Sequence, residues 1–264
     1  MDITKYYWNE GEKPLDCIKT DGGFFSIFRR VACIGDSLSS GEMESLDEAG
    51  NRGYHDMFEY SWGQYMARAA GVEVLNFSRG GMTAEEYCKS FAEANGFWDP
   101  KLACQCYIIA LGVNDILGRK MPLGSTDDIC LEDPEKNADT FAGWYGKIIQ
   151  RYKQIAPKAK FFLVGFPRVR HYIDKCVAVT DLFYKFSEFF ENTYTIDLFR
   201  YAPEHDEKFA KMFYLGGHLN AMGYKLTGLQ IMSYIDFIIR KNPEDFAQVA
   251  FTPADGPHNV QYKW

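Results

Sequence analysis

The chain lacks the marks of several protein classes. No stretch of its 264 residues comes near the ~20 consecutive apolar residues of a membrane-spanning helix. Basic side chains number 29 against 36 acidic ones, and the resulting net charge of −7 argues against a nucleic-acid partner. Neither GxGxxG nor GxxxxGK[ST] follows an expected strand, which disfavours a nucleotide-binding flavodoxin-like protein. We therefore expect neither a membrane span nor nucleic-acid binding.

The cysteines argue against a metal site. Their number, seven, is odd, and they form no CxxC pair. Cys104 and Cys106 share strand parity, but no His or Asp stands near them, so we interpret them as reduced core thiols and expect no metal and no cofactor. The N-terminus lacks a basic segment followed by an apolar one, as a secretory signal would have. Both features favour a cytoplasmic protein, although a trimmed signal would escape this test.

What the chain has is an ordinary globular composition. Apolar residues make up 47% and charged residues 25%, enough for a sizeable core. No linker rich in Pro, Gly or Ser divides the sequence, which predicts one domain over residues 1–264. Residues 1–29 form an N-terminal extension and 250–264 a C-terminal tail, and both are expected to pack on this domain. The tail carries aromatic residues, so a contact between copies in a homo-oligomer is also open.

Five short apolar runs predict buried strands. Runs that are apolar on both faces suit a parallel sheet covered by helices on either side. With helical patterns between them and no linker, they predict an α/β fold: a three-layer αβα sandwich around a flavodoxin-like, doubly wound parallel sheet of about five strands. The expected strands are residues 30–35, 72–77, 104–111, 160–165 and 193–197.

Capping signals place three of the helices. Thr83 and Glu86 have the spacing of a capping box. Asp133-Pro134 looks like an N-cap and first helical residue, opening a helix toward Ile155. Asn220 is expected to cap a last helix that runs to about Asn242-Pro243.

Chemically useful residues follow the expected strands. Gly35-Asp36-Ser37-Leu38 follows the first, a block ending in Gly80-Gly81-Met82-Thr83 the second, and Gly112-Val113-Asn114-Asp115 the third. Gly216-Gly217-His218-Leu219 comes just before the last helix. In open parallel sheets, active residues gather at the carboxyl ends of strands. Together these blocks supply a hydroxyl, a glycine amide, a side-chain amide and an imidazole, the parts of a nucleophile, a base and an oxyanion hole.

These four blocks, in this chain order, resemble the SGNH (GDSL) hydrolase family, which is named for the four residues. The resemblance spans about Val31 to Tyr224. It implies the SGNH hydrolase fold, with Ser37 as nucleophile and His218 as its general base. It further implies an oxyanion hole made by the N–H groups of Ser37 and Gly81 and the side-chain amide of Asn114. Asp36 and Asp115 also match family positions, and we interpret them as orienting loop backbone.

One position departs from the family pattern. The family usually carries Asp three residues before the histidine, where this chain has Leu215. Such an acid fixes the imidazole tautomer, and its loss in serine proteases costs on the order of 10⁴ in rate. Three explanations stay open: a backbone carbonyl near Leu215 orients the ring, a carboxylate such as Asp206 or Glu204 substitutes, or hydrolytic activity is lost.

The resemblance implies a serine-dependent hydrolase that cleaves a small carboxylic ester, such as an acetylated sugar, through an acyl-Ser37 intermediate. An acyltransferase with the same site is the nearest alternative, and Leu215 motivates a non-catalytic acyl- or carbohydrate-binding member. Arg168 and Arg170 are expected in a solvated loop rather than in the pocket. The remaining histidines are expected at the surface: His55, His171, His205 and His258.

Overall fold

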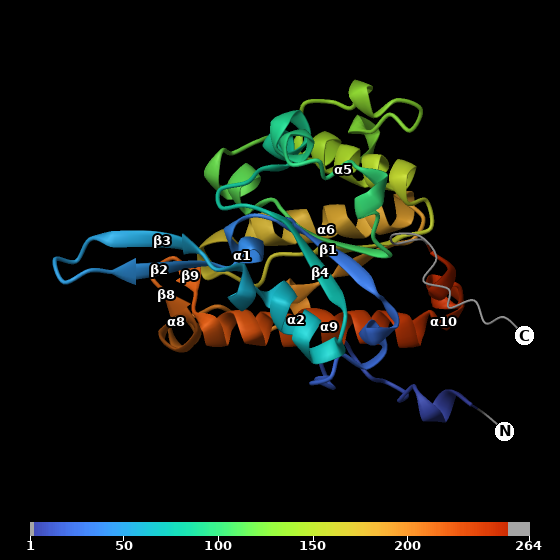
Figure 1. Cartoon of the computed structure of the whole chain (residues 1–264), viewed down its shortest axis with the longest axis horizontal. Coiled ribbons are helices and arrows are strands. Elements are labelled where there is room, and N and C mark those ends of the chain that lie inside the picture. Colours follow the sequence, from blue (N-terminus) through green and yellow to red (C-terminus); the bar gives the residue numbers. More distant parts are fainter. Residues whose placement is uncertain (1–2, 253–264) are drawn as a thin grey trace, which may run out of the picture.

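A five-stranded parallel sheet, in the order β4-β1-β5-β6-β7, forms the middle layer of the structure (Figure 1). Its strands are β1 (Arg30–Gly35), β4 (Glu73–Ser78), β5 (Cys106–Ala110), β6 (Lys160–Val164) and β7 (Thr193–Ile196). The computed structural model describes residues 3–252, so most of the expected C-terminal tail, including His258, lies outside the described residues. The predicted α/β fold is confirmed, and the strand order is that of a doubly wound sheet.

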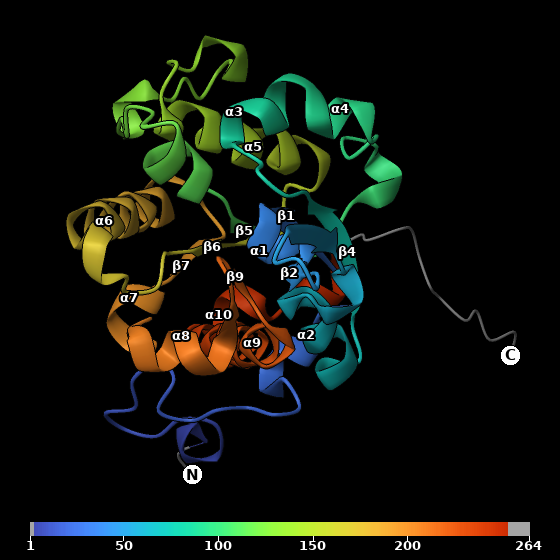
Figure 2. The same cartoon turned by 90° about the vertical axis from the view of Figure 1, so that its left-hand side faces the viewer.

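Helices cover both faces of this sheet (Figure 2). Side chains alternate along β1. Ala32 and Ile34 join the core under α5 (Phe141–Ile155) and α6 (Ile173–Phe189), whereas Val31 and Cys33 join the core under α2 (Trp62–Ala70) and α9 (Ala221–Lys241). This alternation explains why each strand reads as a continuous apolar run. The α-helices are α1 (Ser37–Ser40), α2 (Trp62–Ala70), α3 (Ala84–Glu86), α4 (Ala92–Ala94), α5 (Phe141–Ile155), α6 (Ile173–Phe189), α7 (Leu198–Tyr201), α8 (Glu207–Phe213), α9 (Ala221–Lys241) and α10 (Pro243–Phe246).

Shorter helical turns link these elements. Two π-helical segments, Tyr87–Phe91 and Val113–Gly118, follow α3 and β5. The 3-10 turns are Thr4–Tyr6, Gly23–Ile27, Phe58–Tyr60, Pro100–Leu102, Thr126–Asp128, Pro134–Lys136, Arg170–Tyr172 and Val249–Phe251. No helix within residues 3–252 combines the length and apolar character needed to cross a bilayer.

Two of the three expected helix caps hold, and one is wrong. Thr83 accepts a hydrogen bond from the N–H of Glu86, and Asn220 accepts one from Gly223. Asp133 caps only the 3-10 turn Pro134–Lys136. The long helix α5 begins later, where Thr140 accepts from the N–H of Gly143. Thr140 is as good a capping residue as Asp133, and the apolar face of the helix starts directly after it.

Two antiparallel hairpins were not expected from the sequence. The larger one pairs β2 (Glu42–Leu46) with β3 (Arg52–Asp56) and extends away from the sheet (Figure 1). The smaller one pairs β8 (Tyr214–Leu215) with β9 (His218–Leu219). Strand β2 contacts both strands of the small hairpin. The large hairpin is therefore positioned to place side chains beside His218.

The N-terminal segment packs on helix α9. The N–H of Lys19 donates to Ser233 Oγ at 2.9 Å, and the N–H of Phe24 donates to Asp236 Oδ1 at 2.8 Å. Arg240 forms buried ion pairs with Glu12 at 2.6 Å and with Asp236 at 2.7 Å. These contacts cover the solvent side of α9 with the first part of the chain.

Candidate active site

The carboxyl ends of three neighbouring strands bring the sequence blocks together. Gly35 at the end of β1 pairs with Ser78 of β4 on one side and with Ala110 of β5 on the other. The residues that follow these positions therefore leave the sheet at one edge. The contact between α1 and β9 adds the histidine segment. This edge is also where the strand order reverses direction, the usual place for a site in such sheets.

Ser37 is the first residue of helix α1. The preceding residue, Asp36, caps the helix, because its Oδ1 accepts from the N–H of Leu38 at 3.0 Å. Among residues 3–252, neither the N–H nor the Oγ of Ser37 has a hydrogen-bond partner. The first N–H groups of a helix lack intrahelical acceptors, so that of Ser37 is available to an anion. The half-buried hydroxyl is equally available for reaction.

The imidazole of His218 lies between two carboxylates from strand β2. Its Nδ1 forms a hydrogen bond with Glu44 Oε1 at 2.8 Å. Its Nε2 lies 3.1 Å from Glu42 Oε1. Glu44 is 3% exposed, and its Oε1 also accepts from the N–H of Gly217 at 2.7 Å. A buried acid on Nδ1 fixes the orientation of a histidine that is to act as a base through Nε2.

Two glycines make room for this acid. A Cβ on Gly216 would lie 1.9 Å from Glu44 Oε2, and one on Gly217 would lie 3.0 Å from Glu44 Oε1. Gly216 also has a φ of +68°, which side chains disfavour. The two glycines before the histidine thus leave the space that the carboxylate of Glu44 occupies. Together with the Glu-Met-Glu alternation at 42–44, they are the signal that could have found Glu44.

Charge and hydrogen bonds keep Glu44 ionised. Burial raises the pKa of this carboxyl, but the hydrogen bonds from His218 and Gly217 and the charge of Arg52 outweigh it, so the pKa lies below its ordinary value. Arg52 Nη1 lies 2.7 Å from Glu44 Oε2. An anionic Glu44 can accept a hydrogen bond from Nδ1–H and stabilise an imidazolium.

The three residues expected to orient His218 do not do so. Leu215 pairs with His218 in the small hairpin, but Nδ1 binds Glu44 rather than a carbonyl of that segment, and the leucine is 46% exposed. Asp206 caps α8 by accepting from the N–H of Phe209 at 2.7 Å. Glu204 is exposed. The carboxylate that bonds Nδ1 comes from β2 and not from the preceding loop, where Asp206 and Glu204 lie.

The residues expected in the oxyanion hole follow the two strands that neighbour β1: Gly81 comes after β4 and Asn114 after β5. Gly81 has a φ of +72°, a conformation that favours glycine, and no atom lies within 4 Å of its Cβ position. Its N–H has no acceptor among residues 3–252. Asn114 Nδ2 donates to the carbonyl of Met82 at 3.0 Å, which leaves its second N–H free. The bond to Met82 fixes the amide plane beside the Gly81 turn.

Two buried carboxyls brace these loops. Asp115 Oδ1 accepts from the N–H of Ala84, the first residue of α3, at 2.9 Å, and Asp36 caps α1, so both carboxyls bind backbone N–H groups in the first turn of a helix. Burial raises the pKa of Asp36 to about 7, with the Asp115 charge adding to it. Burial likewise raises the pKa of Asp115 to about 6. Asp115 Oδ2 has no hydrogen-bond partner among the described residues.

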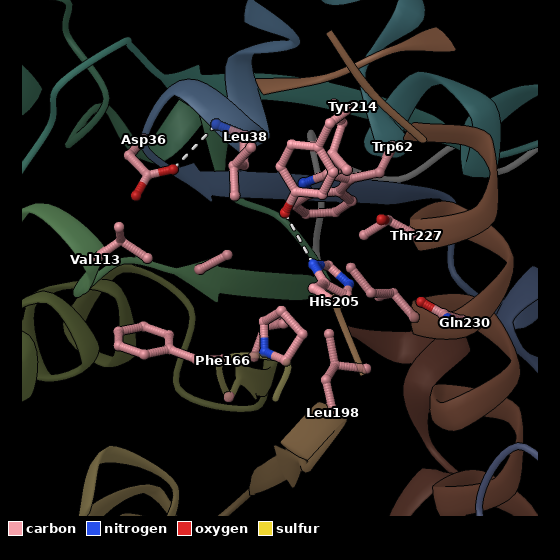
Figure 3. Close-up of a pocket in the computed structure, with 16 residues that line it drawn as sticks. Asp36, Leu38, Trp62, Val113, Phe166, Leu198, His205, Tyr214, Thr227 and Gln230 are labelled. Atoms are coloured by element: carbon pink, nitrogen blue, oxygen red, sulfur yellow. Dashed lines mark hydrogen bonds between the residues drawn. The ribbon is translucent and has the colours of Figure 1, made fainter. Parts of the chain in front are cut away.

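A mostly apolar cavity of about 70 Å³ lies at the carboxyl end of the sheet and is lined by Asp36, Ala110 and Val113 among others (Figure 3). Neighbours in sequence of Ser37, Asn114 and His218 line it, as do side chains from α2, β6 and α9. His205 also lines it and is half-buried rather than fully exposed, and burial lowers its pKa to about 4. Its Nδ1 lies 2.8 Å from Tyr214 Oη. The lining includes Leu38, Val113, Leu219, Trp62, Phe166 and Ile231.

The other candidate residues lie apart from this constellation. His171 and Arg170 are exposed, and Arg168 lies over the ring of Phe199. His55 is exposed and contacts Ser45. All seven cysteines are free thiols, with Cys104 and Cys106 buried. Within the described part of the chain, no cluster of His, Cys, Asp and Glu has the arrangement of a metal site.

Comparisons with known proteins show the family of the chain. The family model of the GDSL-like Lipase/Acylhydrolase family matches residues 33–226. The chain therefore belongs to this family, which confirms the resemblance seen in its four sequence blocks. No curated protein matches the chain significantly.

Several solved structures share the fold. A family two carbohydrate esterase from Clostridium thermocellum is 16% identical, with a TM-score of 0.53 over 89% of this chain and 66% of that one. Est24, a carbohydrate acetylesterase from Sinorhizobium meliloti, is 17% identical, with a TM-score of 0.54 over 80% of this chain and 99% of that one. A family 3 carbohydrate esterase from Clostridium thermocellum is 14% identical, with a TM-score of 0.51 over 81% of this chain and 98% of that one.

Proposed function

We propose that the protein hydrolyses small carboxylic esters through an acyl-Ser37 intermediate. One observation carries the proposal: the buried carboxylate of Glu44 holds Nδ1 of His218 at 2.8 Å, beside the helix that begins at Ser37. Nucleophile, base and acid are then all present, although the acid stands at an unusual position. The reason for considering a non-catalytic binding protein, the leucine at position 215, loses its force.

The first half of the reaction acylates the serine. Nε2 of His218 takes the proton of Ser37 Oγ as the oxygen attacks the ester carbonyl carbon. The negative charge on the carbonyl oxygen is stabilised by the N–H groups of Ser37 and Gly81 and by Asn114. As the tetrahedral intermediate collapses, the C–O bond to the alcohol breaks, and His218 gives its proton to the leaving oxygen. Glu44 stabilises the imidazolium throughout.

The second half releases the acid. His218 takes a proton from a water molecule, whose oxygen attacks the acyl carbon. The same three N–H donors stabilise the second tetrahedral intermediate. As it collapses, the bond between the acyl carbon and Ser37 Oγ breaks, the carboxylic acid leaves, and His218 gives its proton to Ser37 Oγ. The apolar cavity beside Ser37 is our candidate for the acyl pocket, since its lining suits hydrocarbon and its volume suits a short chain. For the alcohol portion we propose a sugar or similar polyol.

Covalent labelling tests the nucleophile. A serine-directed fluorophosphonate should modify Ser37, seen by mass spectrometry of the peptide that contains it, and the Ser37→Ala variant should remain unlabelled. Ser39 and Ser78 are internal controls, because both are buried near the same strand ends. Modification of either with Ser37 unmodified would refute the assignment. Absence of any adduct, together with no hydrolysis of phenyl acetate, would refute the activity.

A further inference from the structure

The carboxylate of Glu42 occupies space that a substrate must share. Its Oε1 lies 3.1 Å from Nε2 of His218, the nitrogen that has to face Ser37. Its Oε2 lies 2.1 Å from the position of a Cβ on Gly80, so the carboxylate lies directly against the turn that presents Gly81. The hydroxyl of Tyr224 donates to the carbonyl of Glu42 at 2.5 Å and fixes the backbone there. Glu42 thus stands between the base and the proposed oxyanion hole.

This carboxylate has few donors around it. Its side chain is 17% exposed, and among residues 3–252 only His218 lies within ion-pair distance of it. The nearby charges are mainly negative: Asp56 lies opposite it in the hairpin, and Glu44 is two residues along the strand. Arg52 is paired with Glu44. Burial, followed by the charges of Asp56 and Glu44, raises the pKa of Glu42 despite the opposing effect of His218.

The contact with Glu42 conflicts with catalysis. An ion pair between Nε2 and Glu42 Oε1 at 3.1 Å requires an imidazolium, which has no lone pair with which to accept the proton of Ser37. For His218 to act as a base, Nε2 must leave Glu42. Glu42 then needs another donor, because a mostly buried carboxylate without one is costly.

The donor that fits is a neutral hydroxyl of the substrate. An imidazolium forms at Nε2 in each half-reaction, and a substrate cation beside it would suffer like-charge repulsion. A hydroxyl next to the ester oxygen donates one hydrogen bond and carries no charge. We propose that Glu42 is a specificity-determining residue: it accepts a hydrogen bond from a free hydroxyl beside the ester in the alcohol portion, and so releases Nε2 of His218 to Ser37. The inference rests on the proposed function.

A pair of matched substrates tests this on the unmodified protein. One is a methyl glycoside monoacetate with a free hydroxyl next to the ester, and the other is the same compound with that hydroxyl methylated. A hydrogen bond to a charged acceptor predicts that kcat/KM is on the order of tenfold to a hundredfold higher for the first compound. Equal kcat/KM values for the two would overturn the proposal even if both are hydrolysed. If neither is hydrolysed, phenyl acetate hydrolysis and labelling of Ser37 show whether the proposed function itself has failed.

Variants then assign the preference to Glu42. Glu42→Leu should bring the ratio of the two kcat/KM values close to one, because the acceptor for the free hydroxyl is removed. Glu48→Leu, in the exposed turn of the same hairpin, is the matched control and should keep the wild-type ratio. Should Glu42→Leu fail to fold, Glu42→Gln should lower the ratio partway. A parallel loss of rate on all three substrates, or an unchanged ratio, would overturn the proposal.

Discussion

Glu44 reaches Nδ1 of His218 from a hairpin 174 residues earlier in the chain, at a distance of 2.8 Å. The family spacing would put an acid at position 215, in the same short segment as the histidine. Here that segment carries Leu-Gly-Gly, and the glycines leave the space that the glutamate fills. The pairing of a carboxylate with Nδ1 of the histidine is thus formed by a residue of strand β2, far away in the sequence.

Glu44→Gln tests whether the acid matters. The variant keeps the volume and removes the charge that holds Nδ1 and stabilises the imidazolium. By comparison with serine proteases, we expect kcat to fall on the order of 10⁴, with a much smaller change in KM. Steady-state kinetics on phenyl acetate and a thermal midpoint on the same preparation separate a catalytic effect from unfolding. A folded variant with wild-type kcat would exclude Glu44 from the mechanism.

Gly216→Ala tests the space that the glycine provides. The new Cβ would meet Glu44 Oε2, so we expect kcat to fall in addition to a loss of stability. Gly71→Ala is the matched control: its φ of +69° is nearly that of Gly216, +68°, and nothing lies within 4 Å of its Cβ position. It should carry the same backbone strain with full activity. Equal kinetics in the two variants would mean that displacement of Glu44 has no catalytic consequence.

The limits of sequence reasoning follow from where each contact comes from. The strands were predictable because β1 and its neighbours are apolar on both faces. The cap at Asn220 was predictable because its hydrogen bond is made to Gly223, only three residues away. The β2–β3 hairpin was not, because Glu42 and Glu44 turn their charges toward His218 and make the strand look like a loop. Nothing within a few residues of either glutamate reveals that partner. The predicted start of the helix at Asp133 was wrong because two residues that cap helices well, Asp133 and Thr140, stand seven residues apart.

Asn114→Ala tests the oxyanion hole. If the free N–H of its amide binds the oxyanion mainly in the transition state, its loss should lower kcat by ~10²–10³ and leave KM nearly unchanged. Met82 loses its hydrogen bond as well, so a thermal midpoint should accompany the kinetics. A large rise in KM with kcat preserved would instead assign Asn114 to ground-state binding.

Ile231→Ala tests the cavity as the acyl pocket. Ile231 lines it, whereas Ile235, one turn further along α9, is buried in the core beside it. Ile235→Ala is the matched control, and both Ile231→Ala and Ile235→Ala should lose about 2–5 kcal/mol of unfolding free energy. Only Ile231→Ala should shift the preference from acetyl and propionyl toward longer esters, measured as kcat/KM for a series of p-nitrophenyl esters. The same chain-length profile in both variants would place the acyl group elsewhere.

Asp36→Asn tests the buried carboxyl next to the nucleophile through the pH dependence of stability. Burial raises the pKa of Asp36 to about 7, so the folded protein keeps a proton that the unfolded chain has lost. The contribution of this group is therefore fully present below the unfolded pKa of ~3.9 and is lost as the pH rises through about 7. The slope of this contribution with pH is at most ~1.4 kcal/mol per pH unit.

Asparagine caps a helix as well as aspartate does, so the bond to the N–H of Leu38 should survive in Asp36→Asn. The free energy of unfolding in urea should thus decline less between pH 5 and pH 8 in the variant than in the wild type. Asp206→Asn, which changes an exposed cap of the same kind on α8, should leave the wild-type decline unaltered. If the Asp36→Asn and wild-type curves run parallel over this range, Asp36 does not take up a proton there on folding.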